Sequence, residues 1–328
     1  MSEENDFLQE DFLSHDFSSR DFFSQDFLSM GDASDFAILM HRDAHFSGNF
    51  DVMIEYYEAE GKGVSNAFEL SRIKELYALE KELKSNLSAL YLSGPQAELV
   101  GQAKSAYKLL KAVYEEDSQK NKIPRLIADL ILAETDEETD LAIASIVKEK
   151  AAIVPALLNL LQSQDFHNPL FPGYGVSAAN AAKCLGLIGD KRAVISLFEA
   201  IGQESSEGSG HFDFFSEDMI LDALFSIGSF ARDFLLKVLH GRPLSMDNER
   251  AAIALIRFKD DPIVSEQCLQ ELLKLDLNKE LILATYLVLA CEGLSPDLFP
   301  KLLEIANHKS TPSSLRQDIL ILNRKNSS

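Results

Sequence analysis

The chain has few cysteines, no long apolar run and far fewer basic than acidic residues. Its three cysteines, Cys184, Cys268 and Cys291, are an odd number and fall inside apolar helical patterns, so we expect buried free thiols in a reducing compartment. No apolar run reaches the roughly 18–20 residues of a membrane span, and the longest, 281–290, lies between glutamates. The N-terminus carries Asp and Glu where a signal peptide would carry Lys or Arg, which predicts a cytoplasmic protein.

The shortage of basic residues also restricts the partners. With 31 Lys and Arg against 52 Asp and Glu, the formal net charge is −21. This charge repels phosphate backbones, and the sequence has no local basic stripe, so we expect no nucleic-acid partner. The acidity is concentrated in residues 1–35, which contain ten acidic residues and one basic residue, Arg20.

Residues 6–30 form five tandem pentads that each begin with Asp-Phe: DFLQE, DFLSH, DFSSR, DFFSQ and DFLSM. A period of five fits neither helix nor strand, so the Phe side chains cannot line one face of either element. We therefore predict a disordered acidic tail over 1–34 that offers repeated short binding motifs. Its candidate partner-binding residues are Phe7, Phe12, Phe17, Phe22 and Phe27.

Three alternatives for this tail stay open. Its Phe side chains would dock on the rest of the same chain, or the tail would become helical on a partner. The pentads also resemble those of pentapeptide-repeat proteins, which implies a β-helical coil.

Residues 35–120 are predicted to form an N-terminal helical region. Two short helices joined at 47–49 come first, and His41 and His45 lie one helical turn apart, a spacing that suits zinc. No third ligand is evident nearby, and the Glu of a His-Glu-x-x-His motif is missing, so we expect two partly exposed histidines and no metal. From residue 65 a helical period interrupted at 94–95 predicts a long antiparallel hairpin, either a first repeat or a dimerising arm.

From about residue 123 the chain is predicted to form helix pairs. Gly189 and Gly228 are expected to end first helices in the left-handed conformation, and Asp190 and Asp260 to cap the helices that follow. The predicted pairs are 137–149 with 152–163, 176–189 with 191–203, 216–228 with 230–240, 247–258 with 262–275, and 278–291 with 295–307, closed by a helix at 312–323.

The stretch AAKCLGLIGDKRAV at 181–194 is the clearest copy of this pattern. On this basis residues 137–307 resemble HEAT repeats, particularly the short, phycobilisome-lyase-like type. The resemblance implies an all-α fold with a right-handed α-solenoid over 121–325, whose concave wall holds a protein or peptide. It implies no particular chemistry, and we expect no cofactor.

Catalytic signatures are few. The sequence lacks the His-Glu pairs with which HEAT-like deoxyhypusine hydroxylases bind iron, and its charge is opposite to that needed by HEAT-like DNA glycosylases. A Gly-x-Gly-x-x-Ala string at 173–178 has no strand before it, and a role of Ser177 as helix N-cap explains it. We therefore predict no catalytic residues, with a HEAT-like lyase or enzyme-maturation factor as the alternative.

Two segments, 164–175 and 204–215, are too long for repeat turns. Both precede the first helix of a pair, so we expect them on the same edge of adjacent repeats. Their aromatic residues favour a partner interface, which makes the protein a non-enzymatic scaffold or adaptor. Packing of the loops on the repeats, and a metal site of Asp165, His167, His211 and Asp213, are the alternatives. The candidate partner-binding residues are Phe166, His167, Phe171, Tyr174, His211, Phe212, Phe214 and Phe215.

Overall fold

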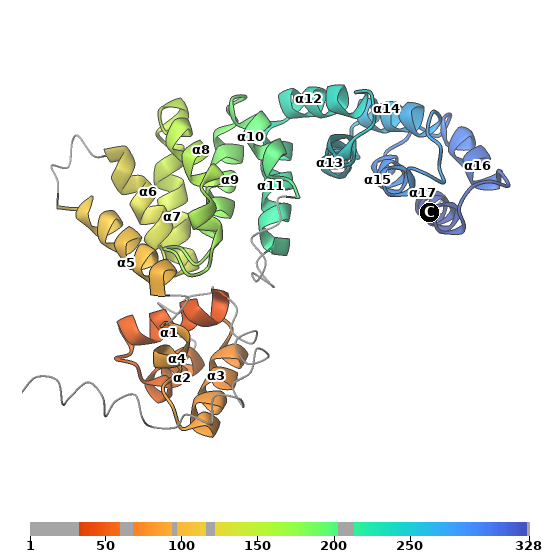
Figure 1. The fold of residues 1–328 in the computed structure, drawn as a ribbon. Coiled ribbons are helices and arrows are strands. Elements are labelled where there is room, and N and C mark those ends of the chain that lie inside the picture. The colour runs from red at the N-terminus through yellow and green to blue at the C-terminus, as the bar shows by residue number, and fades with distance from the viewer. Residues whose placement is uncertain (1–32, 60–67, 94–96, 116–121, 203–212, 327–328) are drawn as a thin grey trace, which may run out of the picture.

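A computed structural model describes residues 33–59, 68–93, 97–115, 122–202 and 213–326 of the protein. Across these ranges the chain forms seventeen α-helices and no β-strand, which confirms the all-α prediction. Figure 1 shows a small N-terminal group of helices, α1–α4, below an arch of paired helices that ends at α17. No helix in these ranges is long and apolar enough to cross a membrane. The predicted tail, with its five candidate Phe residues, lies outside the described residues.

The N-terminal group contains α1 (Ala33–His45), α2 (Phe50–Glu58), α3 (Leu70–Leu83) and α4 (Leu87–Tyr91). α1 packs against α4, and α2 packs against α3. The side chain of Asn49 accepts hydrogen bonds from the backbone N–H groups of Asp51 (2.8 Å) and Val52 (3.4 Å) and so begins α2. Two helices joined at 47–49 are therefore confirmed. Their shared core includes Phe36, Leu39, Met53, Ile73, Leu76 and Leu87.

The first arm of the predicted long hairpin is divided into two helices. α3 ends at Leu83, and Lys84 then adopts the left-handed conformation with φ of 50°. Asn86 starts α4, because its side chain accepts hydrogen bonds from the N–H groups of Ser88 (2.8 Å) and Ala89 (3.3 Å). The apolar period continues across this break and therefore could not reveal it.

A fully buried arginine of α1 stabilises the break between α3 and α4. Arg42 donates hydrogen bonds to Glu80 at the end of α3 (2.8 Å) and to Ser88 at the start of α4 (2.7 Å). Its guanidinium also stacks on the ring of Phe50, 4.5 Å from the ring centre. One side chain thus holds α1, α2, α3 and α4 together.

The helix pairs follow α5 (Ala97–Ala112) and α6 (Lys122–Leu132). Every predicted pair is present, and each predicted boundary lies within four residues of the observed one. The helices are α7 (Asp136–Val147), α8 (Val154–Gln162), α9 (Ser177–Ile188), α10 (Ala193–Ala200), α11 (Asp213–Ile227), α12 (Ser229–Leu239), α13 (Met246–Leu255), α14 (Pro262–Leu272), α15 (Leu281–Ala290), α16 (Phe299–Asn307) and α17 (Ser313–Asn326).

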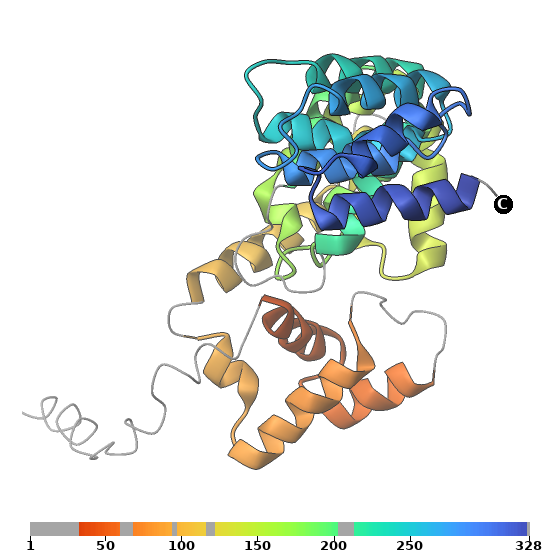
Figure 2. The same cartoon turned by 90° about the vertical axis from the view of Figure 1, so that its right-hand side faces the viewer.

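The pairs stack side by side in two rows. First helices α9, α11, α13, α15 and α17 form an inner row in which each contacts the next, and second helices lie along the outer side of the arch (Figure 1). Figure 2 turns the molecule so that α17 faces the viewer, with the N-terminal group below the arch. One hydrophobic core runs through the arch from Leu130 to Leu322.

The turns inside the pairs partly follow the predicted chemistry. Gly189 ends α9 in the left-handed conformation (φ 69°, ψ 25°), and Asp190 accepts a hydrogen bond from the N–H of Arg192 (2.9 Å). Gly228 has positive φ, but its ψ of −138° places it outside that conformation, so this prediction was wrong. The cap expected from Asp260 is made by Asp261, which accepts from the N–H of Ile263 (2.9 Å).

The three cysteines are buried and free, as predicted. Burial raises the pKa of Cys184 and of Cys291 to about 12. Cys268 is also deeply buried, and its pKa is raised for the same reason. These thiols act as small apolar core residues.

Candidate functional site

The segment 164–175 does not present its aromatic residues together. It begins with a short 3₁₀ helix, Gln164–His167, and continues as turns to the start of α9. Phe166 is half-buried against the core of the arch, and Nε2 of His167 lies 2.9 Å from the carbonyl oxygen of Leu161. His167 thus contacts the adjacent helix α8, and Phe166 packs on the core of the arch.

Phe171 and Tyr174 are buried, so the prediction that they form an open partner surface was wrong. Their side chains are 4% and 8% exposed and belong to the core of the N-terminal group. The Tyr174 ring lies 4.6 Å from the ring of Phe68, measured between centres. This segment therefore attaches the N-terminal group to the arch, and Phe171 and Tyr174 pack on the N-terminal group rather than on the repeats.

Three successive residues of this segment have positive φ. Gly173 and Gly175 have φ of 84° and 82°, and Tyr174 between them has φ of 52°. A Cβ on Gly173 would overlap the hydroxyl of Ser177, so only glycine fits there. Ser177 is the first residue of α9 and is fully buried, with Val176 at the N-cap; the predicted N-cap role of Ser177 was wrong.

His41 lies at the centre of the contact between the N-terminal group and this segment. Its Nδ1 is 2.9 Å from the hydroxyl of Tyr174, and its Nε2 is 3.3 Å from the hydroxyl of Tyr57. Burial, with a smaller effect of His45, lowers the pKa of His41 to about 3, so the ring is neutral at neutral pH. His41 is 4% exposed, which corrects the prediction of two partly exposed histidines; only His45 is exposed.

The second predicted segment lies largely outside the described residues. His211 and Phe212 are among the undescribed residues, and Phe214 and Phe215 lie in the first turn of α11, where only the backbone is described. The metal-site alternative depends on His211 in the same stretch.

The described residues carry another surface that the sequence did not suggest. We call it the turn edge: the edge of the arch where the first helix of each pair ends and the second begins. Six large apolar side chains within one helical turn of these connections are 43–57% exposed. They are Leu187, Ile195, Phe225, Phe230, Ile263 and Leu289.

Contacts between successive turns keep this edge in register. Each links one turn to a neighbouring one along the arch, so the edge is a continuous rim. They are Arg192 with the carbonyl of Ala151 (2.9 Å), Lys191 with the ring of Phe230 (5.8 Å to its centre), Arg232 with Asp261 (2.8 Å), and Lys259 with Glu292 (2.8 Å).

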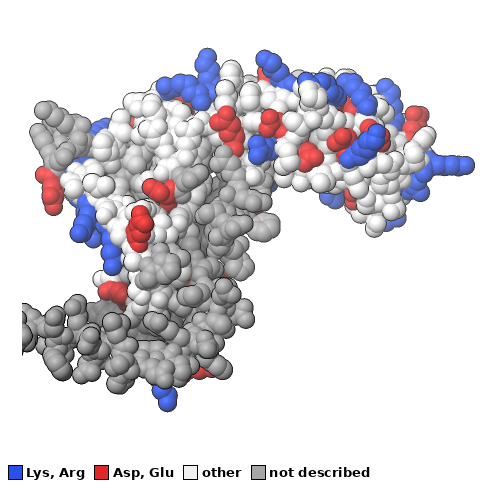
Figure 3. All heavy atoms as spheres, viewed as in Figure 1, with Lys and Arg blue, Asp and Glu red and all other residues white. Residues whose placement is uncertain are grey.

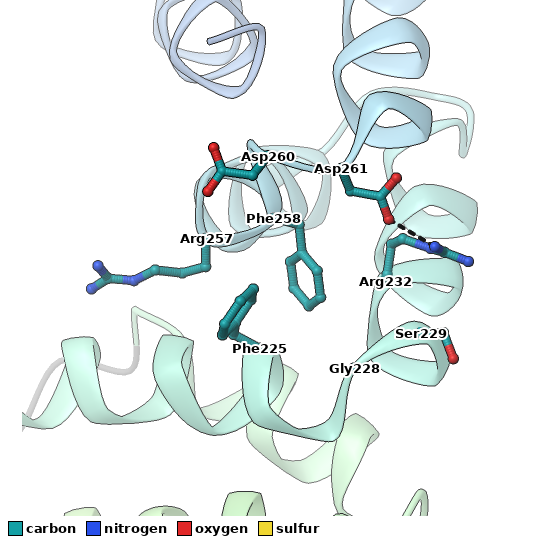
Figure 4. A pocket seen from close by; sticks show the side chains of 8 residues that line it. All are labelled: Phe225, Gly228, Ser229, Arg232, Arg257, Phe258, Asp260 and Asp261. Carbon is teal, nitrogen blue, oxygen red and sulfur yellow. Dashed lines mark hydrogen bonds and ion pairs between the residues drawn. The ribbon is translucent and has the colours of Figure 1, made fainter. Parts of the chain in front are cut away.

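A pocket of about 260 Å³ opens at the middle of the turn edge (Figure 4). The rings of Phe225 and Phe258 meet edge to face there, with centres 5.1 Å apart and planes inclined by 65°. Arg232 and Asp261 form an ion pair on one side, and the hydrogen bond from Arg232 lowers the pKa of Asp261. The volume of the pocket is slightly below the range of about 300–1,000 Å³ that is usual for small-molecule sites.

Charged side chains are unevenly placed on the face seen in Figure 3. Lys and Arg lie mainly along the upper margin of the arch, over the outer helices, and at the C-terminal end. Asp and Glu side chains are scattered among uncharged ones over the middle of the same face.

Comparison of the chain with protein-family models, with curated proteins and with solved structures finds no significant match.

Proposed function

We propose that this protein is a HEAT-like, right-handed α-solenoid that works as a non-enzymatic scaffold or adaptor. Its turn edge binds a protein or peptide partner, and its Asp-Phe tail supplies a second binding element. The observation that carries the proposal is the row of half-exposed apolar side chains along that edge. Exposed apolar side chains gathered on one edge with charged neighbours are typical of protein interaction sites.

The pocket supports a peptide rather than a small ligand. Phe225 is 51% exposed although it contacts Phe258, so an apolar partner side chain can reach the aromatic pair. The neighbouring ion pair of Arg232 and Asp261 is available for hydrogen bonding at the rim. In protein interfaces, a few residues that fill pockets surrounded by a rim contribute most of the binding energy.

The tail is proposed as a separate binding element. The start of α1 limits how far a deletion of the tail can extend. Asp35 in the first turn of α1 is fully buried and receives two hydrogen bonds of 2.7 Å from Arg72. A deletion that tests the tail should therefore stop at residue 32, so that this ion pair is kept.

The proposal is tested by affinity capture from cells with two matched double variants of the full chain. Ile195→Ser with Ile263→Ser alters the turn edge, at side chains that are 57% and 51% exposed. Leu273→Ser with Ile282→Ser alters the opposite ends of the helices, at side chains that are 53% and 57% exposed. We expect the first variant to lose partners that the second retains.

Both variants should fold, since exposed substitutions usually change stability by about 0.5 kcal/mol or less each. Circular dichroism melts check this point. If both variants capture the same partners as the unaltered chain, the turn edge is not the binding surface. A chain lacking residues 1–32 tests the tail in the same experiment.

A further inference from the structure

Two segments far apart in the sequence bring three metal-binding side chains together. His41 and His45 lie one turn apart on α1, with ring centres 4.6 Å apart. Glu134 follows α6 directly and lies beside them, with Oε1 3.7 Å from Nε2 of His45. One ligand atom from each of the three lies within 4.8 Å of the others. The third ligand missing from the local sequence is thus supplied by a residue 89 positions beyond His45 (134 − 45).

One of the three separations is close to that of a metal-bound set. Zinc lies about 2.0–2.2 Å from nitrogen and oxygen ligands, so tetrahedral ligand atoms are roughly 3.4 Å apart. The pair His45 and Glu134 is within a few tenths of an ångström of that value. Their side chains are 48% and 33% exposed, and neither is locked in the core as His41 is.

The buried member of the set is held as a metal-binding imidazole should be. A tyrosine hydroxyl lies within hydrogen-bonding distance of each ring nitrogen of His41. A cation that takes one nitrogen displaces one hydroxyl, while the other keeps the ring oriented from the opposite side. Metal-binding histidines are generally oriented by such a second hydrogen bond.

The donor set also selects the class of cation. Two imidazoles and one carboxylate suit zinc and neighbouring transition metals, whereas magnesium and calcium prefer all-oxygen sites. Three protein ligands leave a fourth position for water or for a group from a partner. We propose that His41, His45 and Glu134 form a binding site for Zn²⁺ or a cation of its class. The bound ion ties α1 of the N-terminal group to the start of the arch.

The test uses full-length protein stripped of metal with a chelator. Zinc chloride is titrated in by calorimetry, with magnesium chloride as the comparison, and thermal midpoints are measured with and without zinc. His45→Ala and Glu134→Gln remove the two partly exposed ligands without emptying the core at His41. His308→Ala and Asp140→Asn are matched controls, because both residues are exposed and lie in other parts of the arch.

The unaltered chain and both controls should bind one equivalent of zinc and melt at a higher temperature with it. Each ligand variant should bind that equivalent at least about tenfold more weakly and lose the thermal shift. Magnesium should produce neither effect. The proposal is overturned if the unaltered chain binds no zinc, or if the ligand variants bind it as tightly as the controls. In either case His45 and Glu134 form only an ion pair.

Discussion

A close contact between two helices of the arch gives a sharp prediction. Gly186 on α9 faces Ala223 on α11, and a Cβ built on Gly186 would lie 2.6 Å from Cα and 3.0 Å from Cβ of Ala223. Carbon atoms in contact are normally about 3.5–4.0 Å apart, so Gly186→Ala must push these two helices apart. Gly101 on α5 is the matched control, because a Cβ there meets no atom within 4 Å.

The two substitutions should change stability in opposite directions. Alanine improves helix propensity by about 0.5–1 kcal/mol at either site. At Gly101 no steric cost opposes this gain, so Gly101→Ala should stabilise the protein by that amount. At Gly186 overpacking costs about 1–3 kcal/mol, and the contact with backbone atoms places it near the upper end. Gly186→Ala should therefore destabilise the protein by about 2 kcal/mol.

Urea unfolding followed by circular dichroism measures the sign, and hydrogen exchange measures the location. Amide protons of α9 and α11 should exchange faster in Gly186→Ala, while those of α15 to α17 should change little, since each pair contacts only its neighbours. If Gly186→Ala is as stable as Gly101→Ala, the close packing of α9 on α11 is refuted.

Three further predictions concern buried polar groups and thiols. Asn248→Asp keeps the side-chain shape but loses the amide that donates to the carbonyls of Val238 (3.1 Å) and Leu239 (2.9 Å), so urea unfolding should show a loss of about 2–3 kcal/mol. Arg42→Met leaves Glu80 without its buried cation and should lower the free energy of unfolding by about 3–5 kcal/mol. Amide protons of α4 should exchange faster in this variant. Unchanged exchange there would contradict the role of Arg42 in holding α4. Iodoacetamide at neutral pH should leave all three cysteines unmodified until the protein is unfolded, because burial raises their pKa values; mass spectrometry of the native protein checks this.

The helix pairs could be predicted because their determinants are local. Apolar residues at helical spacing mark each helix, and turn residues such as Gly189 and Asp190 end one helix and begin the next. The division between α3 and α4 is different, because the buried Arg42 reaches it from another helix. The apolar period of a helix does not reveal a side chain that enters from another helix, so the sequence predicted one helix.

The site residues were harder to predict for a related reason. Phe171 and Tyr174 have the composition of an interface, but the N-terminal group covers them, and composition does not distinguish a partner from the rest of the chain. Leu187 and Ile195 belong to apolar helical patterns of the repeats, yet each is more than half exposed. A helical-wheel plot would have identified them, because both side chains lie outside the helix face that their buried neighbours form.

The two ends of α9 have separate roles, and this makes the two proposals independent. The segment before Ser177 carries Tyr174, which contacts His41 of the proposed metal site, whereas Leu187 lies at the turn edge. A helix of 12 residues is about 18 Å long at about 1.5 Å per residue. Effects of substitutions more than about 7–10 Å apart without shared partners usually add. Combining His45→Ala with Ile195→Ser and Ile263→Ser should therefore give the sum of the separate effects on zinc and on partner capture. A departure from additivity would show that the N-terminal group and the turn edge are coupled through α9.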